Sequence, residues 1–299
     1  MTPARASTSD VPARGIALSV LGGAFLTLND AVLKWLTSDY PVGQLLFMRG
    51  IFVFLPIAFL TWRAGGFEVL RINRFRNQAT RSGFAFASGF LFITGISFLP
   101  LADAIAITFA GPLFITALAP SMLGETVGWR RWAAVFIGFV GVLVMIRPSA
   151  EAVQWAALLP LTASLAGALR DLTTRKIATS ETSMSILWFT TATVMLGGLC
   201  TLPWGWSPLT FRDVGLMALS GLLVGSAHYC LIDRFRWAEA ALLAPFKYLS
   251  MVWAVILGFV LWGDLPDTWT LSGAAVVIGG GLYILHREVQ KGRSRPSLG

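Results

Sequence analysis

Ten apolar segments, each about 20 residues long, fill nearly the whole chain. An α-helix needs roughly 20 apolar residues to cross the hydrocarbon core of a bilayer. Ten such helices use about two thirds of the 299 residues, and the remainder forms loops and tails. Only 13% of the residues are charged, against about 25% in soluble domains. The sequence therefore predicts an all-α membrane protein whose function lies inside the helix bundle.

The boundaries of the apolar segments give the expected membrane-spanning helices. They are residues 14–36, 42–62, 82–99, 103–123, 129–147, 152–172, 184–203, 213–232, 238–261 and 269–286. Proline and glycine mark the joints, as at Pro41, Pro100 and Gly128. Residues 67–81 combine apolar side chains with four arginines, which predicts an amphipathic stretch on the membrane surface.

The basic residues predict the orientation of the chain. Apart from Arg49, Arg170 and Lys247, which fall inside apolar segments, 17 of the 23 basic residues are expected on one side of the membrane and only three, Lys34, Arg147 and Arg212, on the other. Cytoplasmic loops carry the excess of Lys and Arg, so both termini are expected in the cytoplasm. Topology and contact with anionic lipid explain the net charge of +8, and nucleic acid is not an expected partner.

The first segment has an alternative interpretation. Residues 1–14 contain two arginines and several Ser and Thr residues, as short targeting peptides do. The apolar part of a cleaved signal peptide is about 7–15 residues long, whereas this segment has full spanning length. We therefore expect an uncleaved first helix.

The two halves of the chain look like diverged copies of each other. Asp30 is followed four residues later by Lys34, and Asp171 by Arg175. The matching features also include Gly124-Glu125 with Gly263-Asp264, Gly141 with Gly280, Leu143 with Leu282, and a proline inside each corresponding helix, Pro112 and Pro245. Five helices per half is an odd number, so the second half must enter the membrane inverted, as in many transporters. We expect halves at 14–147 and 152–286, with cytoplasmic tails at 1–13 and 287–299.

These features resemble the EamA-type ten-helix carriers of the drug/metabolite transporter superfamily. The resemblance rests on the proline-containing fourth helix ending in Gly124-Glu125, on Gly138 and Gly141, on Pro41 and Arg49, and on a poorer echo at Gly263-Asp264 and Gly273 to Gly281. It implies a solute carrier of a prokaryotic inner membrane, most similar to exporters of aromatic amino acids. The second half departs from the pattern, because Asp264 replaces the usual Glu and no arginine matches Arg49.

Ionisable side chains inside a membrane are costly and indicate function. Lys247 lies deep in its segment beside Pro245, which can open the helix there. Its ammonium group suits a substrate carboxylate or phosphate. The structural alternative is an ion pair with Asp30 or Asp171.

The other polar residues inside the apolar segments each allow a functional and a structural interpretation. Asp30 could bind a substrate ammonium, or it could pair with Lys34 one turn away. Arg49, Arg170 and Asp171 are expected in ion pairs, which gate a carrier if they form in one state only. His228 could contact substrate or relay a proton, although a hydrogen-bonded wall residue is the commoner role.

Aromatic side chains inside the helices can wall a cavity. We expect this of Phe90, Phe109, Trp188, Tyr248 and Trp253, because such rings stack on flat or apolar substrate groups. Packing within the bundle is the alternative for each of them.

Together these residues predict a secondary carrier that exports small zwitterionic metabolites, most simply neutral or aromatic amino acids, by alternating access through a central cavity. The alternatives are a carrier of sugar phosphates or nucleotide sugars, and a passive channel. The sequence has no P-loop, HExxH or GxSxG motif, so we expect neither an enzyme nor a bound metal or cofactor. Glycine pairs on several helices allow close packing, and we expect a monomer or a weak homo-oligomer.

Overall fold

The described part of the chain is entirely helical. A computed structural model describes residues 10–293 except 64–65, 67–69, 71, 125–126, 147–154, 178–179, 235–236 and 238–242, and within that part it has eleven α-helices and no strand. Six helical stretches are long and apolar enough to cross a membrane, and two shorter apolar helices lie at Val42–Leu55 and Phe246–Trp262. The all-α membrane class expected from the sequence is thus confirmed, whereas the count of ten spans stays a prediction.

The helices follow one another with short connections. They are α1 (Asp10–Leu36), α2 (Val42–Arg63), α3 (Phe75–Phe98), α4 (Leu101–Thr108), α5 (Gly111–Leu123), α6 (Trp129–Ile146), α7 (Trp155–Ile177), α8 (Ser183–Leu199), α9 (Phe211–Asp233), α11 (Leu249–Trp262) and α12 (Thr268–Arg293). The 3₁₀ segments η2 (Leu202–Trp204) and η4 (Ala244–Tyr248) precede α9 and α11.

Two expected boundaries differ from the structure. Helix α3 begins at Phe75, so the second half of the predicted surface stretch 67–81 belongs to a long helix, and residues 67–69 and 71 lie outside the described part. Gln78 and Ser82 are fully buried in it, which explains why the helix continues through this polar stretch. Helix α12 runs to Arg293, so part of the predicted tail 287–299 is helical.

The fourth expected segment, 103–123, is not one continuous helix. Helix α4 ends at Thr108, Phe109 and Ala110 form a turn, and α5 begins at Gly111 with Pro112 in its first turn. Proline lacks the amide hydrogen that a continuing helix would use, so it is tolerated at a helix start. Glu125, expected at the end of this segment, lies outside the described residues.

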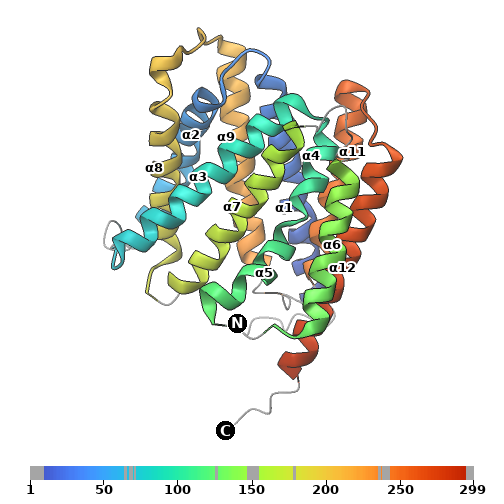
Figure 1. The fold of residues 1–299 in the computed structure, drawn as a ribbon. Helices are drawn as coiled ribbons and strands as arrows, with labels where there is room; N and C mark the ends of the chain where they lie inside the picture. Colours follow the sequence, from blue (N-terminus) through green and yellow to red (C-terminus); the bar gives the residue numbers. More distant parts are fainter. Residues whose placement is uncertain are drawn as a thin grey trace.

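The helices form one bundle in which α1 begins and α12 ends at the same end (Figure 1). Helix α3 packs across α7, α1 beside α9, α2 beside α8, and α6 beside α12. The α6–α12 pair is close because glycines face each other: a Cβ added to Gly273 would lie 2.6 Å from the carbonyl oxygen of Gly141. Only glycine allows the two backbones to approach this closely.

Polar contacts tie the helices together at the end away from the termini (Figure 1). The ammonium group of Lys34 donates to the carbonyl oxygen of Leu99 at 2.6 Å and lies 3.9 Å from the carboxylate of Asp264. The hydroxyl of Tyr40 donates to Asp213 at 2.8 Å. These contacts join α1 and the α1–α2 turn to α9 and to the loop after α11. The expected local pair of Lys34 with Asp30 is replaced by contacts distant in sequence.

Candidate transport site

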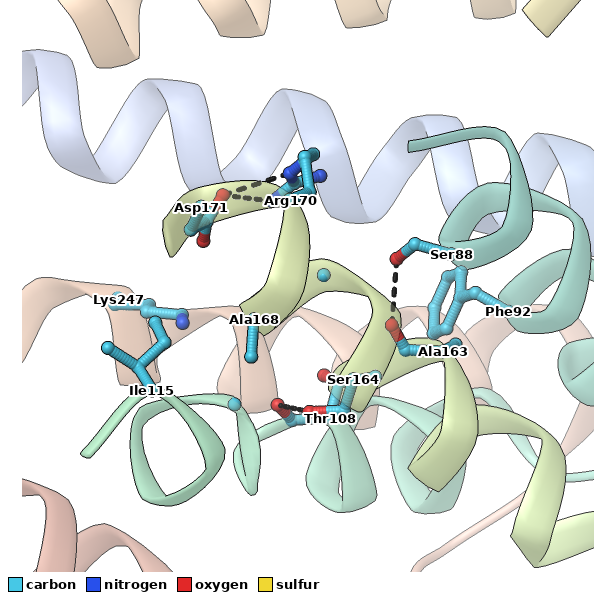
Figure 2. Close-up of a pocket in the computed structure, with 12 residues that line it drawn as sticks. Ser88, Phe92, Thr108, Ile115, Ala163, Ser164, Ala168, Arg170, Asp171 and Lys247 are labelled. Atoms are coloured by element: carbon cyan, nitrogen blue, oxygen red, sulfur yellow. Dashed lines mark hydrogen bonds and ion pairs between the residues drawn. The ribbon is translucent and has the colours of Figure 1, made fainter. Parts of the chain in front are cut away.

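A cavity of about 170 Å³ lies between α3, the α4–α5 break, α7 and η4 (Figure 2). Its lining combines hydroxyl, apolar and charged side chains, namely Ser88, Phe92, Thr108, Gly111, Ile115, Ala163, Ser164, Gly167, Ala168, Arg170, Asp171 and Lys247. Cavities with a few convergent polar groups inside an apolar surround are typical of small-molecule sites.

Two interrupted helices open this cavity. The α4–α5 break places Thr108 and Gly111 in its wall, and the 3₁₀ segment η4, with a proline in its first turn, carries Lys247. Irregular backbone at membrane depth is tolerated where it lines a cavity. Discontinuous helices of this kind form substrate sites in secondary transporters.

Serine hydroxyls fasten α7 to its neighbours beside the cavity (Figure 2). Ser88 of α3 donates to the carbonyl oxygen of Ala163 at 2.8 Å, and Ser164 donates to the carbonyl oxygen of Thr108 at 3.0 Å. The second bond gives the freed carbonyl at the end of α4 a partner. Because each hydroxyl uses its hydrogen on the backbone, its oxygen remains an acceptor for a bound solute.

The charged part of the lining is formed by Arg170, Asp171 and Lys247. The Nε and Nη2 atoms of Arg170 each lie 2.9 Å from Oδ1 of Asp171 (Figure 2). The side chain of Lys247 is exposed although it lies within the bundle, and its ammonium group makes no hydrogen bond or ion pair with the described residues. Asp171 nevertheless attracts this charge, and Arg170 and Arg234 repel it. The site thus offers a cation that a solute can reach.

A second polar cluster lies outside this lining, between α1, α2 and α9. Asn29 donates to Asp30 at 3.0 Å and accepts a hydrogen bond from Ser220 at 2.6 Å. Asp30 also attracts the guanidinium of Arg49. The cluster therefore joins α1 and α2 to α9, and none of its residues is part of the cavity lining.

His228 likewise lies outside the cavity lining. Its Nδ1 atom is 2.7 Å from the carbonyl oxygen of Val224 on the same helix, so the proton of a neutral ring is placed on Nδ1. The side chain is exposed, which leaves Nε2 as the atom that can act as an acceptor.

None of the five aromatic residues expected to wall the cavity is part of its lining. Phe109 and Tyr248 meet edge to face at 5.1 Å and join the two helix breaks. Trp188 packs on Phe54 at 4.6 Å, and Phe90 lies 5.7 Å from Phe86. The indole nitrogens of Trp188 and Trp253 are buried without a hydrogen-bond partner among the described residues.

Sequence reasoning missed several residues at the site. Phe92 and Ile115 form its apolar wall, and Ser88, Thr108 and Ser164 its hydroxyl groups. Small hydroxyl residues inside apolar helices are common, so only the helix crossing distinguishes these from others. Of the charged residues proposed from the sequence, the structure brings Lys247, Arg170 and Asp171 to the cavity.

Comparisons with known proteins agree with this architecture. Residues 13–147 match the EamA-like transporter family. The chain is 30% identical over 283 residues to a riboflavin transporter of Rhizobium johnstonii, covering 93% of each chain. It is 26% identical to an S-adenosylmethionine uptake transporter of Rickettsia bellii, covering 92% of this chain and 94% of the relative.

One crystal structure has the same fold, with a TM-score of 0.60 at 18% identity, covering 96% of this chain and 99% of that one. The names of the two relatives do not support the narrower expectation of an aromatic amino-acid exporter. The matches do agree with a membrane bundle built around a solute cavity. The chain belongs to the EamA-like transporter family of the drug/metabolite transporter superfamily, and it is a secondary transporter rather than an enzyme.

Proposed function

We propose that this chain carries small metabolites across the inner membrane by alternating access, with ten spans, two inverted halves at 14–147 and 152–286, and both termini in the cytoplasm. The packing of the helices supports the repeat. If α1, α2 and α3 are exchanged with α7, α8 and α9, the contact of α1 with α9 becomes that of α7 with α3, and both are extensive. The contact of α2 with α9 likewise becomes that of α8 with α3.

The helix ends support the same repeat. Gly124 ends α5 and Gly263 ends α11, and both adopt left-handed backbone conformations, with φ of 69° and 73°. Such C-terminal caps favour glycine because other residues are strained there. A proline also precedes the body of each capped helix. It lies in the first turn of α5 itself, and in the first turn of the 3₁₀ segment η4 that leads into α11.

The observation that carries the proposal is the cavity at the two helix breaks, lined by Lys247 and the Arg170–Asp171 pair. With the termini in the cytoplasm, the contacts of Lys34 and Tyr40 close the external end of the bundle. A cavity of about 170 Å³ is below the roughly 300–1,000 Å³ of sites for drug-sized ligands. A larger solute therefore requires the bundle to widen, which interrupted helices permit.

Riboflavin is our first candidate substrate. The support is the 30% identical relative together with a site that offers donors for ring carbonyls, Lys247 and Arg170, beside the apolar wall of Phe92 and Ile115. S-adenosylmethionine fits less well, because it carries a sulfonium cation and the site exposes an ammonium group without an ion-pair partner among the described residues.

A neutral or aromatic amino acid is the second candidate, and one observation favours it. The ammonium group of Lys247 is open to a carboxylate, while the Asp171 side chain, 47% exposed, is open to an α-ammonium group. Export of such a solute would use the same cavity. The two candidates differ in the group that Lys247 binds.

A counterflow assay with the purified chain in proteoliposomes tests the function. Vesicles loaded with unlabelled riboflavin should accumulate labelled riboflavin transiently and saturably. Vesicles loaded with unlabelled S-adenosylmethionine should not accumulate labelled S-adenosylmethionine. Exchange of phenylalanine or tryptophan instead would favour the second candidate. Non-saturating flux of all of them would indicate a channel and refute the carrier.

A further inference from the structure

Arg81 is the last residue of the stretch 67–81, which the sequence predicted to lie on the membrane surface. It lies on α3, seven residues before Ser88 and therefore about 10 Å along the same helix face. Its Nε atom donates to the hydroxyl of Thr174 at 2.8 Å, and Nη1 donates to the hydroxyl of Thr190. Two neutral hydroxyls on α7 and α8 thus hold the guanidinium in place without neutralising its charge.

Arg81 belongs to the same electrostatic cluster as the cavity. Thr174 follows the lining residue Asp171 by about one turn on α7, so the hydrogen bond to Thr174 places Arg81 about one helical turn from that part of the lining. Its charge interacts with those of Arg170 and Asp171. Lys247 interacts with the same two residues and also with Arg234. Arg81, Arg170 and Lys247 therefore share one acid, Asp171, which Arg170 already contacts twice through Oδ1.

An excess of positive charge inside a membrane bundle is costly unless an anion compensates it. Arginine suits carboxylate and phosphate oxygens because its planar group can donate two parallel hydrogen bonds. The Nη2 atom of Arg81 makes no hydrogen bond with the residues that the structure describes. The ammonium group of Lys247 is open as well, so donors remain on two sides of the cluster.

We propose that Arg81, Arg170 and Lys247 form a subsite for an anionic group, a carboxylate or a phosphomonoester, on the transported solute. The subsite rests on the proposed function only in that the solute enters this cavity, and it favours an anionic solute over riboflavin, which carries neither of these groups. Phosphate usually recruits several cations, and α3, α7 and η4 together supply three. In this subsite Arg81 binds the anion from α3, near the C-terminal end of α7. Lys247 binds it from η4, and Arg170 binds it from α7.

The test compares two flavins that differ only in a phosphate. Purified chain in lipid nanodiscs is titrated with riboflavin and with riboflavin 5′-phosphate, and binding is followed by flavin fluorescence. We expect the phosphorylated flavin to bind at least about tenfold more tightly, a difference of about 1.4 kcal/mol. Equal affinities, or tighter binding of riboflavin, would overturn the subsite.

Variants of Arg81 assign the preference to this residue. Arg81→Met should remove most of the preference while riboflavin binding is retained, and Arg81→Lys should keep part of it. Arg76→Met is the matched control, because Arg76 is exposed on the first turns of the same helix. An Arg81→Met protein that folds and keeps the full preference would show that Arg81 only fastens α3 to α7 and α8.

A second measurement separates this inference from the choice of flavin. Thermal unfolding of the wild-type chain is followed with inorganic phosphate, acetate or chloride at equal ionic strength. Stabilisation by phosphate alone indicates a phosphomonoester, and stabilisation by acetate as well indicates a carboxylate. The two proposals can be separated when neither flavin binds. If phosphate or acetate then stabilises the wild-type chain more than it stabilises Arg81→Lys, the flavin assignment fails and the anion subsite stands. Absence of stabilisation by either anion, together with absence of flavin binding, refutes the subsite.

Discussion

At the scale of single residues, the position of Lys247 is the informative one. A lysine nine residues inside an apolar segment and next to Pro245 indicates a functional cation from the sequence alone. The structure adds what surrounds it, namely a cavity, the Arg170–Asp171 pair and an open ammonium group. For Asp30 the sequence suggested Lys34 as the partner, but the structure surrounds this residue with Asn29 and Arg49 instead.

Replacement of Lys247 tests its role directly. Lys247→Met keeps the length of the side chain and removes the charge, and a charged hydrogen bond contributes roughly 1.5–3 kcal/mol. We expect the initial rate of counterflow to fall by about tenfold or more while the protein elutes as a folded species in detergent. Lys176→Met, at the exposed end of α7, should leave the rate unchanged. A Lys247→Met variant with the wild-type rate would remove the lysine from the substrate site.

At the scale of elements, the breaks and the close helix contacts position the site. The sequence contains both prolines, yet it does not locate the α4–α5 turn, which lies at Phe109 and Ala110, before Pro112. Whether a helix continues past a proline depends on partners for the freed carbonyls. Here Ser164 of α7 supplies one such partner, and that contact exists only once α7 packs against α4.

The α6–α12 crossing gives a prediction about stability. A Cβ on Gly273 would lie 2.5 Å from the Met145 side chain and 2.6 Å from the Gly141 carbonyl oxygen, whereas a Cβ on Gly279 of the same helix meets nothing within 4 Å. We expect Gly273→Ala to destabilise the protein by about 1–3 kcal/mol, since overpacking forces the backbones apart. Gly279→Ala should change stability by less than about 0.5 kcal/mol. Thermal unfolding of both variants in one detergent measures the difference, and equal melting temperatures would contradict the close crossing.

At the scale of the whole molecule, the helices surround a cavity and polar contacts join them at one end. Lys34, Tyr40 and Gln44 make the connections there, the last through two hydrogen bonds with Ser207 at 2.8 and 2.9 Å. In the alternating-access cycle proposed above, we expect release of the Lys34 and Tyr40 contacts to accompany opening at this end.

The orientation of the bundle is tested by labelling from outside. Leu209 lies in the exposed loop before α9, and Lys176 lies at the exposed opposite end of α7. In a Cys200→Ser/Cys230→Ser background, Leu209→Cys should react with a membrane-impermeant maleimide in intact cells, and Lys176→Cys should react only after the cells are permeabilised. The reversed pattern would place both termini outside and would exchange the roles of the open and closed ends.

The sequence by itself determined the all-helical membrane class and the family, and it singled out Lys247, which the structure places in the cavity lining. These follow from apolar length, from glycine and proline positions, and from a charged residue inside an apolar segment, all of which are properties of short stretches of chain. The tertiary structure alone decided which polar groups meet. It assigned Lys34 to Leu99 and Asp264, Arg81 to Thr174 and Thr190, and left Trp188 outside the cavity lining. Such contacts depend on where two helices cross, and a helix of fixed sequence can cross its neighbours at many positions and angles.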